Sequence, residues 1–157
     1  MTDATPLFAG ETAPDFTLPR DGGGMVSLSA LRPSRVVLYF YPRDDTSGCT
    51  TEAKDFTGLQ GKFAALGVTV IGVSKDSVTS HDKFVKKHDL GVMLVSDENG
   101  TTCEDYGVWV EKQMYGKTYR GIERATFLIG ADGKLQQVWR KVKAKGHATA
   151  VLAALSA

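Results

Sequence analysis

The segment "RVVLYFYPRDDTSGC", residues 35–49, decides the fold. Its first half, residues 35–41, is dense in β-branched and aromatic side chains and shows no alternation of apolar and polar residues. That pattern is typical of a central strand covered on both faces. Pro42 ends the strand, and the turn and capping residues after it bring Cys49 to the start of the next element. We therefore expect Cys49 just beyond the carboxyl end of a buried strand.

A helical pattern follows this segment directly. Apolar side chains recur at steps of three or four, the spacing of one buried helical face, at Phe56, Leu59, Phe63 and Leu66. Gly67 closes the pattern, as glycine often does after a helix. Cys49 would then lie close to the N-terminus of this helix.

The rest of the chain continues to alternate strands and helices. The patterns predict, in order, a strand at 68–74, a helix at 80–91, a strand at 92–97, a short helix at 101–108, a hairpin with strands at 125–129 and 135–142, and a helix at 147–155. Such alternation implies right-handed parallel crossovers, and the late hairpin adds an antiparallel edge. We expect an α/β fold in which helices flank a central mixed sheet, as one domain over residues 1–157. In such sheets, sites form beyond the carboxyl ends of central strands.

The composition is that of a soluble globular protein. Apolar residues make up 42% and charged residues 24%, and 19 basic against 18 acidic side chains leave a net charge of +1. This balance gives no reason to expect nucleic acid or a membrane surface as partner. The longest apolar run, 36–41, is far shorter than the roughly 20 residues of a membrane span, and residues 1–16 do not resemble a secretory signal. We expect a cytoplasmic protein.

Cys49 has to be judged by its surroundings, because two cysteines are too few for a disulfide framework. If Thr46 or Ser47 caps the helix, Cys49 lies in the first turn, where unpaired N–H groups and the helix dipole favour an anion. The anion of cysteine, the thiolate, is its nucleophilic form. Glu52 and Asp45 would oppose it with negative charge, so a cation is needed to offset them.

Arg124 is the most suggestive of the seven arginines, because it stands at the entrance to the buried strand at 125–129. With that cation present, helix-end N–H groups and the hydroxyl of Thr46 could bind an oxygen that gains charge while Cys49 attacks its neighbour. This arrangement suits the reduction of a peroxide, which leaves a cysteine sulfenic acid. The alternative is a buried structural cysteine, the more common setting, although the flanks "TSG" and "TTE" are polar.

The residues around Cys49 resemble the active-site signature of the peroxiredoxins. In "YFYPRDDTSGCTTE", the signature Pro-x-x-x-Thr-x-x-Cys is supplied by Pro42, Thr46 and Cys49. The similarity runs from about Gly10 through "SDENGTTCEDYGVW" and "MYGKTYRGIERATFLIGADGK" to the last helix. It points to the bacterioferritin comigratory protein, or peroxiredoxin Q, subfamily.

The resemblance implies a thioredoxin-like fold and thiol-dependent reduction of hydrogen peroxide and organic hydroperoxides, with no cofactor and no metal. It implies that Cys49 is the peroxidatic cysteine, that Thr46 hydrogen-bonds the peroxide and the thiolate, that Pro42 shields the thiolate from water, and that Arg124 activates it. The reductant would be an external thiol, from thioredoxin, glutaredoxin or glutathione. Members of the subfamily are commonly monomers, and we expect a monomer here.

The chain departs from the subfamily at both usual positions of a resolving cysteine. Lys54 stands five residues after Cys49, and Val85 occupies the place in the following helix. Two mechanisms remain. In the one we favour, an outside thiol reduces the Cys49 sulfenic acid directly. In the other, local unwinding of the first helix brings Cys49 to Cys103, so that a disulfide can form. Considered by itself, Cys103 is interpreted as a small apolar residue that packs a short helix.

Other functions find less support in the residues. The alternative from another class is a non-catalytic thioredoxin-fold redox sensor or interaction module. A disulfide reductase is weakened because Glu52 stands where Cys-x-x-Cys needs its second sulfur. The basic run at 140–147 is most simply a solvated strand end. Three histidines lack the spacing of a zinc site and are expected at the surface or the core edge, namely His81, His88 and His147.

Overall fold

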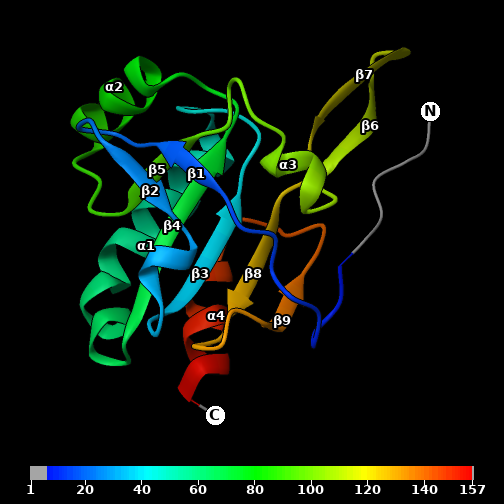
Figure 1. Ribbon diagram of the computed structural model, residues 1–157. Helices are drawn as coiled ribbons and strands as arrows, with labels where there is room; N and C mark the ends of the chain where they lie inside the picture. Colours follow the sequence, from blue (N-terminus) through cyan, green and yellow to red (C-terminus); the bar gives the residue numbers. More distant parts are fainter. Residues whose placement is uncertain (1–6, 157) are drawn as a thin grey trace.

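The computed structural model describes residues 7–156, and Figure 1 shows a central sheet with helices packed against it. The prediction of one domain over residues 1–157 also reaches residues 1–6 and 157, which lie outside the described part. Five strands form the central sheet in the order β5-β4-β3-β8-β9. Their bounds are β3 Arg35–Phe40, β4 Val68–Ser74, β5 Met93–Ser96, β8 Ala125–Ile129 and β9 Leu135–Trp139.

The sheet is mixed, as the sequence predicts. β3 lies at its centre, parallel to β4 on one side and antiparallel to β8 on the other. β4 runs parallel to β5, and β8 and β9 form the predicted antiparallel hairpin. Because β3 is covered on both faces, all of its residues but the first are buried. The expected α/β fold with a central mixed sheet flanked by helices is confirmed.

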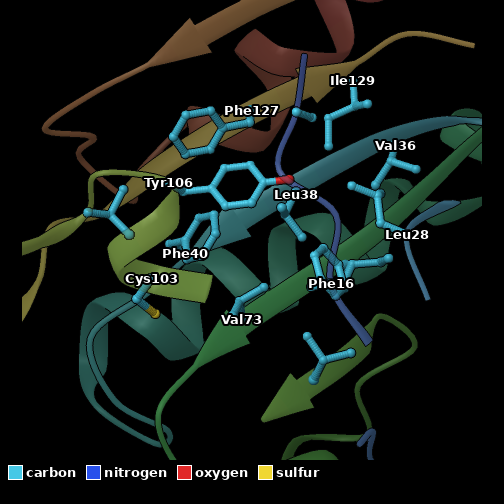
Figure 2. Close-up of a cluster of buried hydrophobic side chains, with 14 of the residues drawn as sticks. Phe16, Leu28, Val36, Leu38, Phe40, Val73, Cys103, Tyr106, Phe127 and Ile129 are labelled. Atoms are coloured by element: carbon cyan, nitrogen blue, oxygen red, sulfur yellow. The ribbon is translucent and has the colours of Figure 1, made fainter. Parts of the chain in front are cut away.

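Opposite faces of the sheet are covered by different parts of the chain. The helices are α1 Ser47–Ala65, α2 Val78–His88, α3 Thr102–Asp105 and α4 His147–Ser156, with a 3-10 turn at Ser29–Leu31. Val37 and Tyr39 of β3 point into a cluster with apolar side chains of α1, α2 and α4. Leu38 and Phe40 point the other way, into a cluster with Tyr106 and the N-terminal segment (Figure 2).

The two cysteines therefore lie on opposite faces of the sheet. Cys49 belongs to the cluster under α1, α2 and α4. Cys103 belongs to the other cluster, where Figure 2 shows it beside Phe40 and Val73. The central sheet stands between the two sulfur atoms.

Two small hairpins were not predicted. β1 (Thr17–Pro19) pairs with β2 (Met25–Ser27), and β6 (Trp109–Met114) pairs with β7 (Lys117–Ile122). Most side chains of β6 and β7 are exposed or half-buried, so neither strand shows the apolar pattern of a buried strand. Main-chain pairing forms this hairpin, which projects from the rest of the molecule in Figure 1. Hydropathy patterns do not detect such a hairpin.

Some sequence predictions differ in detail from the structure. Leu66 is not on the buried face of α1: it follows the helix as its C-cap residue and is 37% exposed. The strand predicted at 135–142 ends at Trp139, since Lys141 adopts a positive φ of 49° that an extended strand does not allow. The basic run at 140–147 is accordingly a loop that leads into α4.

Candidate active site

Cys49 lies in the first turn of α1, just beyond the carboxyl end of β3, as predicted. Thr46 is the N-cap residue, with extended backbone angles. The N–H groups of the first helical turn therefore have no partner within the helix, and they point toward the end where Cys49 is mounted. Cys49 is only 1% exposed, so a reactant must enter a pocket to reach its sulfur.

Arg124 contacts the sulfur directly. Phe40 of β3 pairs with Ala125 of β8, so the residue before Ala125 lies beside the end of β3. The Nη2 atom of Arg124 donates a hydrogen bond to Cys49 Sγ at 3.4 Å. The predicted association of this guanidinium with the cysteine is present in the structure.

Glu52 holds the same guanidinium from its other side. Its Oε1 atom accepts a hydrogen bond of 2.6 Å from Nη1 of Arg124, and its side chain is fully buried. Burial raises the pKa of Glu52 to about 7, although the charge of Arg124 works in the opposite direction. Burial alone would lower the pKa of Arg124, but the charges of Glu52 and Cys49 raise it. Glu52 was expected to oppose the thiolate with its charge; the structure shows in addition that it bonds the guanidinium that contacts Cys49.

Spacing on the helix was the signal that could have identified Glu52. It stands three residues after Cys49, so the two side chains share one face of α1.

Gly48 is a second residue of the site that the sequence analysis missed. A Cβ atom at Gly48 would lie 3.0 Å from Nη2 of Arg124, so the absence of a side chain lets the guanidinium approach the helix end.

Thr46 and Pro42 lie in the loop between β3 and α1. The hydroxyl of Thr46 donates a hydrogen bond of 2.9 Å to the carbonyl oxygen of Arg43 and makes no capping bond to the helix. Because its single proton is engaged there, the Thr46 oxygen is left as an acceptor. Pro42 and Thr46 both line a cavity of about 570 Å³ between this loop and the β6–β7 hairpin.

The carboxylate of Asp45, which we expected to oppose the thiolate, is bound by groups of α2. Its carboxylate turns toward α2, where it accepts bonds from Nζ of Lys87 at 2.6 Å and Nε2 of His88 at 2.7 Å. These two hydrogen bonds lower the pKa of Asp45. Its negative charge is thus paired with Lys87, and His88 adds a hydrogen bond.

The neighbouring Asp44 forms a buried ion pair with His81, which is not at the core edge as predicted but fully buried. Nδ1 of His81 lies 2.7 Å from Oδ2 of Asp44, and Nε2 lies 2.9 Å from the carbonyl oxygen of Val95. Tyr41 donates a further bond of 2.6 Å to Asp44. Burial alone would lower the pKa of His81, but the bonds to Asp44 raise it. This pair joins the loop before Cys49 to α2.

His147 is also buried rather than exposed. Its Nε2 lies 2.7 Å from Oγ1 of Thr126, and burial lowers the pKa of His147 to about 4. Within residues 7–156, no group of three or more histidine, cysteine, aspartate or glutamate side chains is arranged to hold a metal ion. In the same range, no helix is both long enough and apolar enough to cross a membrane.

Comparison with known proteins places this site in a family. Residues 9–138 match the family model described as AhpC/TSA family, which is most of the chain. The chain belongs to the AhpC/TSA family. It is 48% identical over 157 residues to peroxiredoxin Bcp of Xanthomonas campestris, covering 100% of this chain and 98% of that one. It is 50% identical over 146 residues to a putative peroxiredoxin of Coxiella burnetii, covering 93% and 97%.

Solved structures agree with this assignment. The bacterioferritin comigratory protein of Xanthomonas campestris, described for its alkyl peroxide reduction activity, superposes with a TM-score of 0.87 at 45% identity over 98% of each chain. Peroxidoxin BcpB of Mycobacterium tuberculosis superposes with a TM-score of 0.84 at 35% identity, over 96% of this chain and 97% of that one. The resemblance to the Bcp, or peroxiredoxin Q, group and the thioredoxin-like fold are both confirmed. This peroxiredoxin is a thiol-dependent peroxidase, with a peroxide as substrate and a thiol as reductant.

Proposed function

We propose that this peroxiredoxin reduces hydrogen peroxide and organic hydroperoxides through a sulfenic acid on Cys49, by a one-cysteine mechanism. The observation that carries the proposal is the hydrogen bond of 3.4 Å from Arg124 to Cys49 Sγ. A guanidinium in this place stabilises the thiolate, which is the form that attacks an O–O bond. The Xanthomonas relative, described as reducing alkyl peroxides, supports the substrate class.

The surrounding groups suit the first half-reaction. The thiolate attacks the terminal oxygen of the hydroperoxide, the O–O bond breaks, and the other oxygen takes up a proton and leaves as an alcohol or water. Charge develops on the leaving oxygen, close to the guanidinium of Arg124 and the free N–H groups of the first turn of α1. The oxygen of Thr46, whose own proton is engaged with Arg43, can accept the peroxide hydrogen.

The second half-reaction needs a sulfur from outside the chain. Cys103 is fully buried on the opposite face of the sheet from Cys49, among the side chains of the other core cluster. Burial and the nearby carboxylate of Asp97 raise the pKa of Cys103 far above its usual range, so its thiolate is scarce. Lys54 is exposed on α1, and Val85 packs against the cluster that contains Cys49. Neither offers a thiol, which favours direct reduction of the sulfenic acid.

The proposal is tested by comparing two cysteine variants in peroxide consumption with dithiothreitol as reductant. Cys49→Ser should lose turnover completely. Cys103→Ala, the matched control, should keep turnover close to that of the unmodified protein, because Cys103 belongs to the core cluster on the opposite face of the sheet from Cys49. Equal loss of activity in both variants would contradict the one-cysteine mechanism. A single oxidation of Cys49 without sustained turnover would instead favour a redox sensor.

We also expect a monomer in the cytoplasm, with no nucleic acid or membrane as partner. The near balance of 19 basic and 18 acidic side chains supports the absence of a polyanionic partner. Size-exclusion chromatography with light scattering on the reduced and the oxidised protein tests the oligomeric state, and a mass near 17 kDa in both is the expected result.

A further inference from the structure

The cavity lined by Pro42 and Thr46, in the loop that precedes Cys49, is larger than a peroxide alone requires. Its volume of about 570 Å³ falls within the range of sites for small organic molecules. One wall is the loop that carries Pro42 and Thr46, and the other is the β6–β7 hairpin. A molecule bound here would lie against the loop that leads to Cys49.

Positive charge in this cavity is not balanced by partners in the chain. Three of the lining side chains form no salt bridge within residues 7–156, namely Arg43, Lys112 and Arg120. Burial lowers the pKa of Lys112, and so does the nearby charge of Arg124, which places Lys112 in the field of the active site. The Nε atom of Arg120 is buried and has no partner among the described residues.

The remaining charged side chains of the cavity are already paired. Nζ of Lys75 lies 2.9 Å from Glu104 and 3.4 Å from Asp97. Oδ2 of Asp76 accepts bonds from the N–H of Asp44 and the hydroxyl of Ser74. The unpaired charge that faces a bound molecule is therefore positive, and the complementary ligand is an anion.

Because no resolving cysteine lies near Cys49 among the described residues, the anion that suits this cavity is one that also carries a thiol. With Cys103 on the far face of the sheet, the second half-reaction takes place only if an outside sulfur reaches a cysteine that is 1% exposed. A small thiol can enter a cavity of this size while the site keeps its folded geometry. A cysteine held in the surface of another protein could not enter the cavity together with its surroundings.

We propose that this cavity binds a low-molecular-weight thiol bearing carboxylates, of the kind represented by glutathione, as the reductant of Cys49. The inference rests on the proposed peroxidase function and deepens it. The bound thiol attacks the sulfenic sulfur, an S–S bond forms, and the hydroxyl leaves as water with the thiol proton. A second thiolate then attacks the sulfur of the bound molecule, which regenerates the Cys49 thiolate and releases the disulfide. In total, one hydroperoxide and two thiols give one alcohol, one water and one disulfide.

The test uses the full chain with Cys49 first oxidised by one equivalent of hydrogen peroxide. Reduction of the sulfenic acid is followed by stopped flow, with glutathione and with its diethyl ester, which carries the same thiol without the carboxylates. Rate constants are expressed per thiolate. We expect glutathione to react roughly fivefold faster or more, since each ion pair at an accessible site contributes up to about 1 kcal/mol. The preference should disappear at about 1 M salt, where charges are screened within about 3 Å.

Lys112→Gln, compared with a matched surface variant, locates the effect. Lys112→Gln should reduce the preference for glutathione over its ester severalfold. Lys134→Gln removes the same charge from the exposed turn between β8 and β9, at the opposite end of the sheet, and should keep the preference. Equal rates for glutathione and its ester in the unmodified protein would overturn the inference. An equal loss of the preference in Lys112→Gln and Lys134→Gln would also overturn the inference. The preference would then depend on the net charge of the protein and not on binding in this cavity.

Two further outcomes separate the inference from the function beneath it. Loss of one titratable thiol after one equivalent of peroxide reports the first half-reaction alone. If that loss does not occur, the proposed peroxidase function is contradicted. If it occurs but glutathione reacts no faster than its ester, only the proposed thiol-binding site is contradicted. A fatty-acid hydroperoxide is compared with its methyl ester in the oxidation step. A carboxylate preference confined to that step would assign the cavity to the peroxide and contradict a thiol site.

Discussion

At the scale of single residues, one guanidinium at the proposed active site makes two bonds at once. Arg124 donates to Cys49 at 3.4 Å and to Glu52 at 2.6 Å. The bond to Glu52 already restricts the long side chain of Arg124. Little further rotamer entropy is therefore lost when Arg124 contacts the sulfur. We therefore expect Glu52 to act as a positioning residue for Arg124, which contacts the sulfur of Cys49 in the proposed reaction.

Arg124→Gln should slow the reaction of Cys49 with hydrogen peroxide on the order of a hundredfold, because a charged donor beside the developing charge is lost. The second-order rate constant of thiol loss, measured by stopped flow, checks this. Arg35→Gln is the control, since Arg35 begins β3 at the opposite end of the sheet from the site. A rate constant within a factor of three of the unmodified protein would show that the contact with Cys49 does not assist the reaction.

Glu52 should give stability a dependence on pH. Because its pKa is raised from 4.5 to about 7, the folded state holds a proton that the unfolded state has already released between these values. The free energy of unfolding therefore falls as pH rises from about 4.5 to 7. In Glu52→Gln this contribution is absent, so the decrease across that window should be smaller. Urea unfolding at closely spaced pH values measures it, and an unchanged slope would contradict the raised pKa.

At the scale of elements, a buried ion pair attaches α2 to the loop before α1. Asp44 in the loop meets His81 in the first turn of α2, and Asp45 in the same loop meets Lys87 and His88 at the end of that helix. The loop that carries Thr46 is therefore held along the length of α2. We therefore expect α2 to restrain the loop that precedes the first turn of α1.

His81→Leu should destabilise the protein by about 3–5 kcal/mol, because Asp44 would remain buried without its cation. The pKa of His81 is raised, so its contribution is complete below its unfolded value of about 6.5 and is lost as pH rises through the higher folded value. Denaturant unfolding measures both effects. His88→Gln, which breaks the exposed pair with Asp45, should cost less than about 1 kcal/mol.

A double variant tests whether the loss comes from the unpaired carboxylate. Asp44→Asn combined with His81→Leu should recover part of the stability that His81→Leu alone loses, since no buried charge is then left without a partner. Additive losses in the double variant would show that the two side chains contribute independently.

At the scale of the whole molecule, the central sheet separates the two sulfurs. A disulfide requires its two Cα atoms to approach within about 7 Å, and Cys49 and Cys103 belong to core clusters on opposite faces of β3. Bringing them together would require disruption of the core around Cys103. The fold thus supports external reduction more strongly than any single contact does.

Intact mass after one equivalent of hydrogen peroxide should increase by one oxygen, the mark of sulfenic acid, in both the unmodified protein and Cys103→Ala. With excess peroxide and no thiol, further oxygens should be added, because no internal thiol traps the first product. A loss of two hydrogens in the unmodified protein, absent in Cys103→Ala, would instead reveal a bridge between the two cysteines.

The sequence by itself determined the elements whose signals are local. The segment at 35–41, rich in β-branched and aromatic residues, predicted the central strand, and apolar spacing after Cys49 predicted α1, because neighbouring side chains along one element share one environment. Turn chemistry at "DG" predicted the hairpin of β8 and β9. These signals were sufficient to put Cys49 at a helix end beyond a central strand.

Only the tertiary structure decided which distant side chains meet. Arg124 and Cys49 are 75 residues apart, Asp44 and His81 are 37 apart, and the face of the sheet that receives Cys103 depends on how α3 packs. The hairpin of β6 and β7 was missed because main-chain bonds, not a buried apolar face, hold it. Contacts between distant residues depend on strand register and on burial of charge, and neither quantity can be read from a short stretch of sequence.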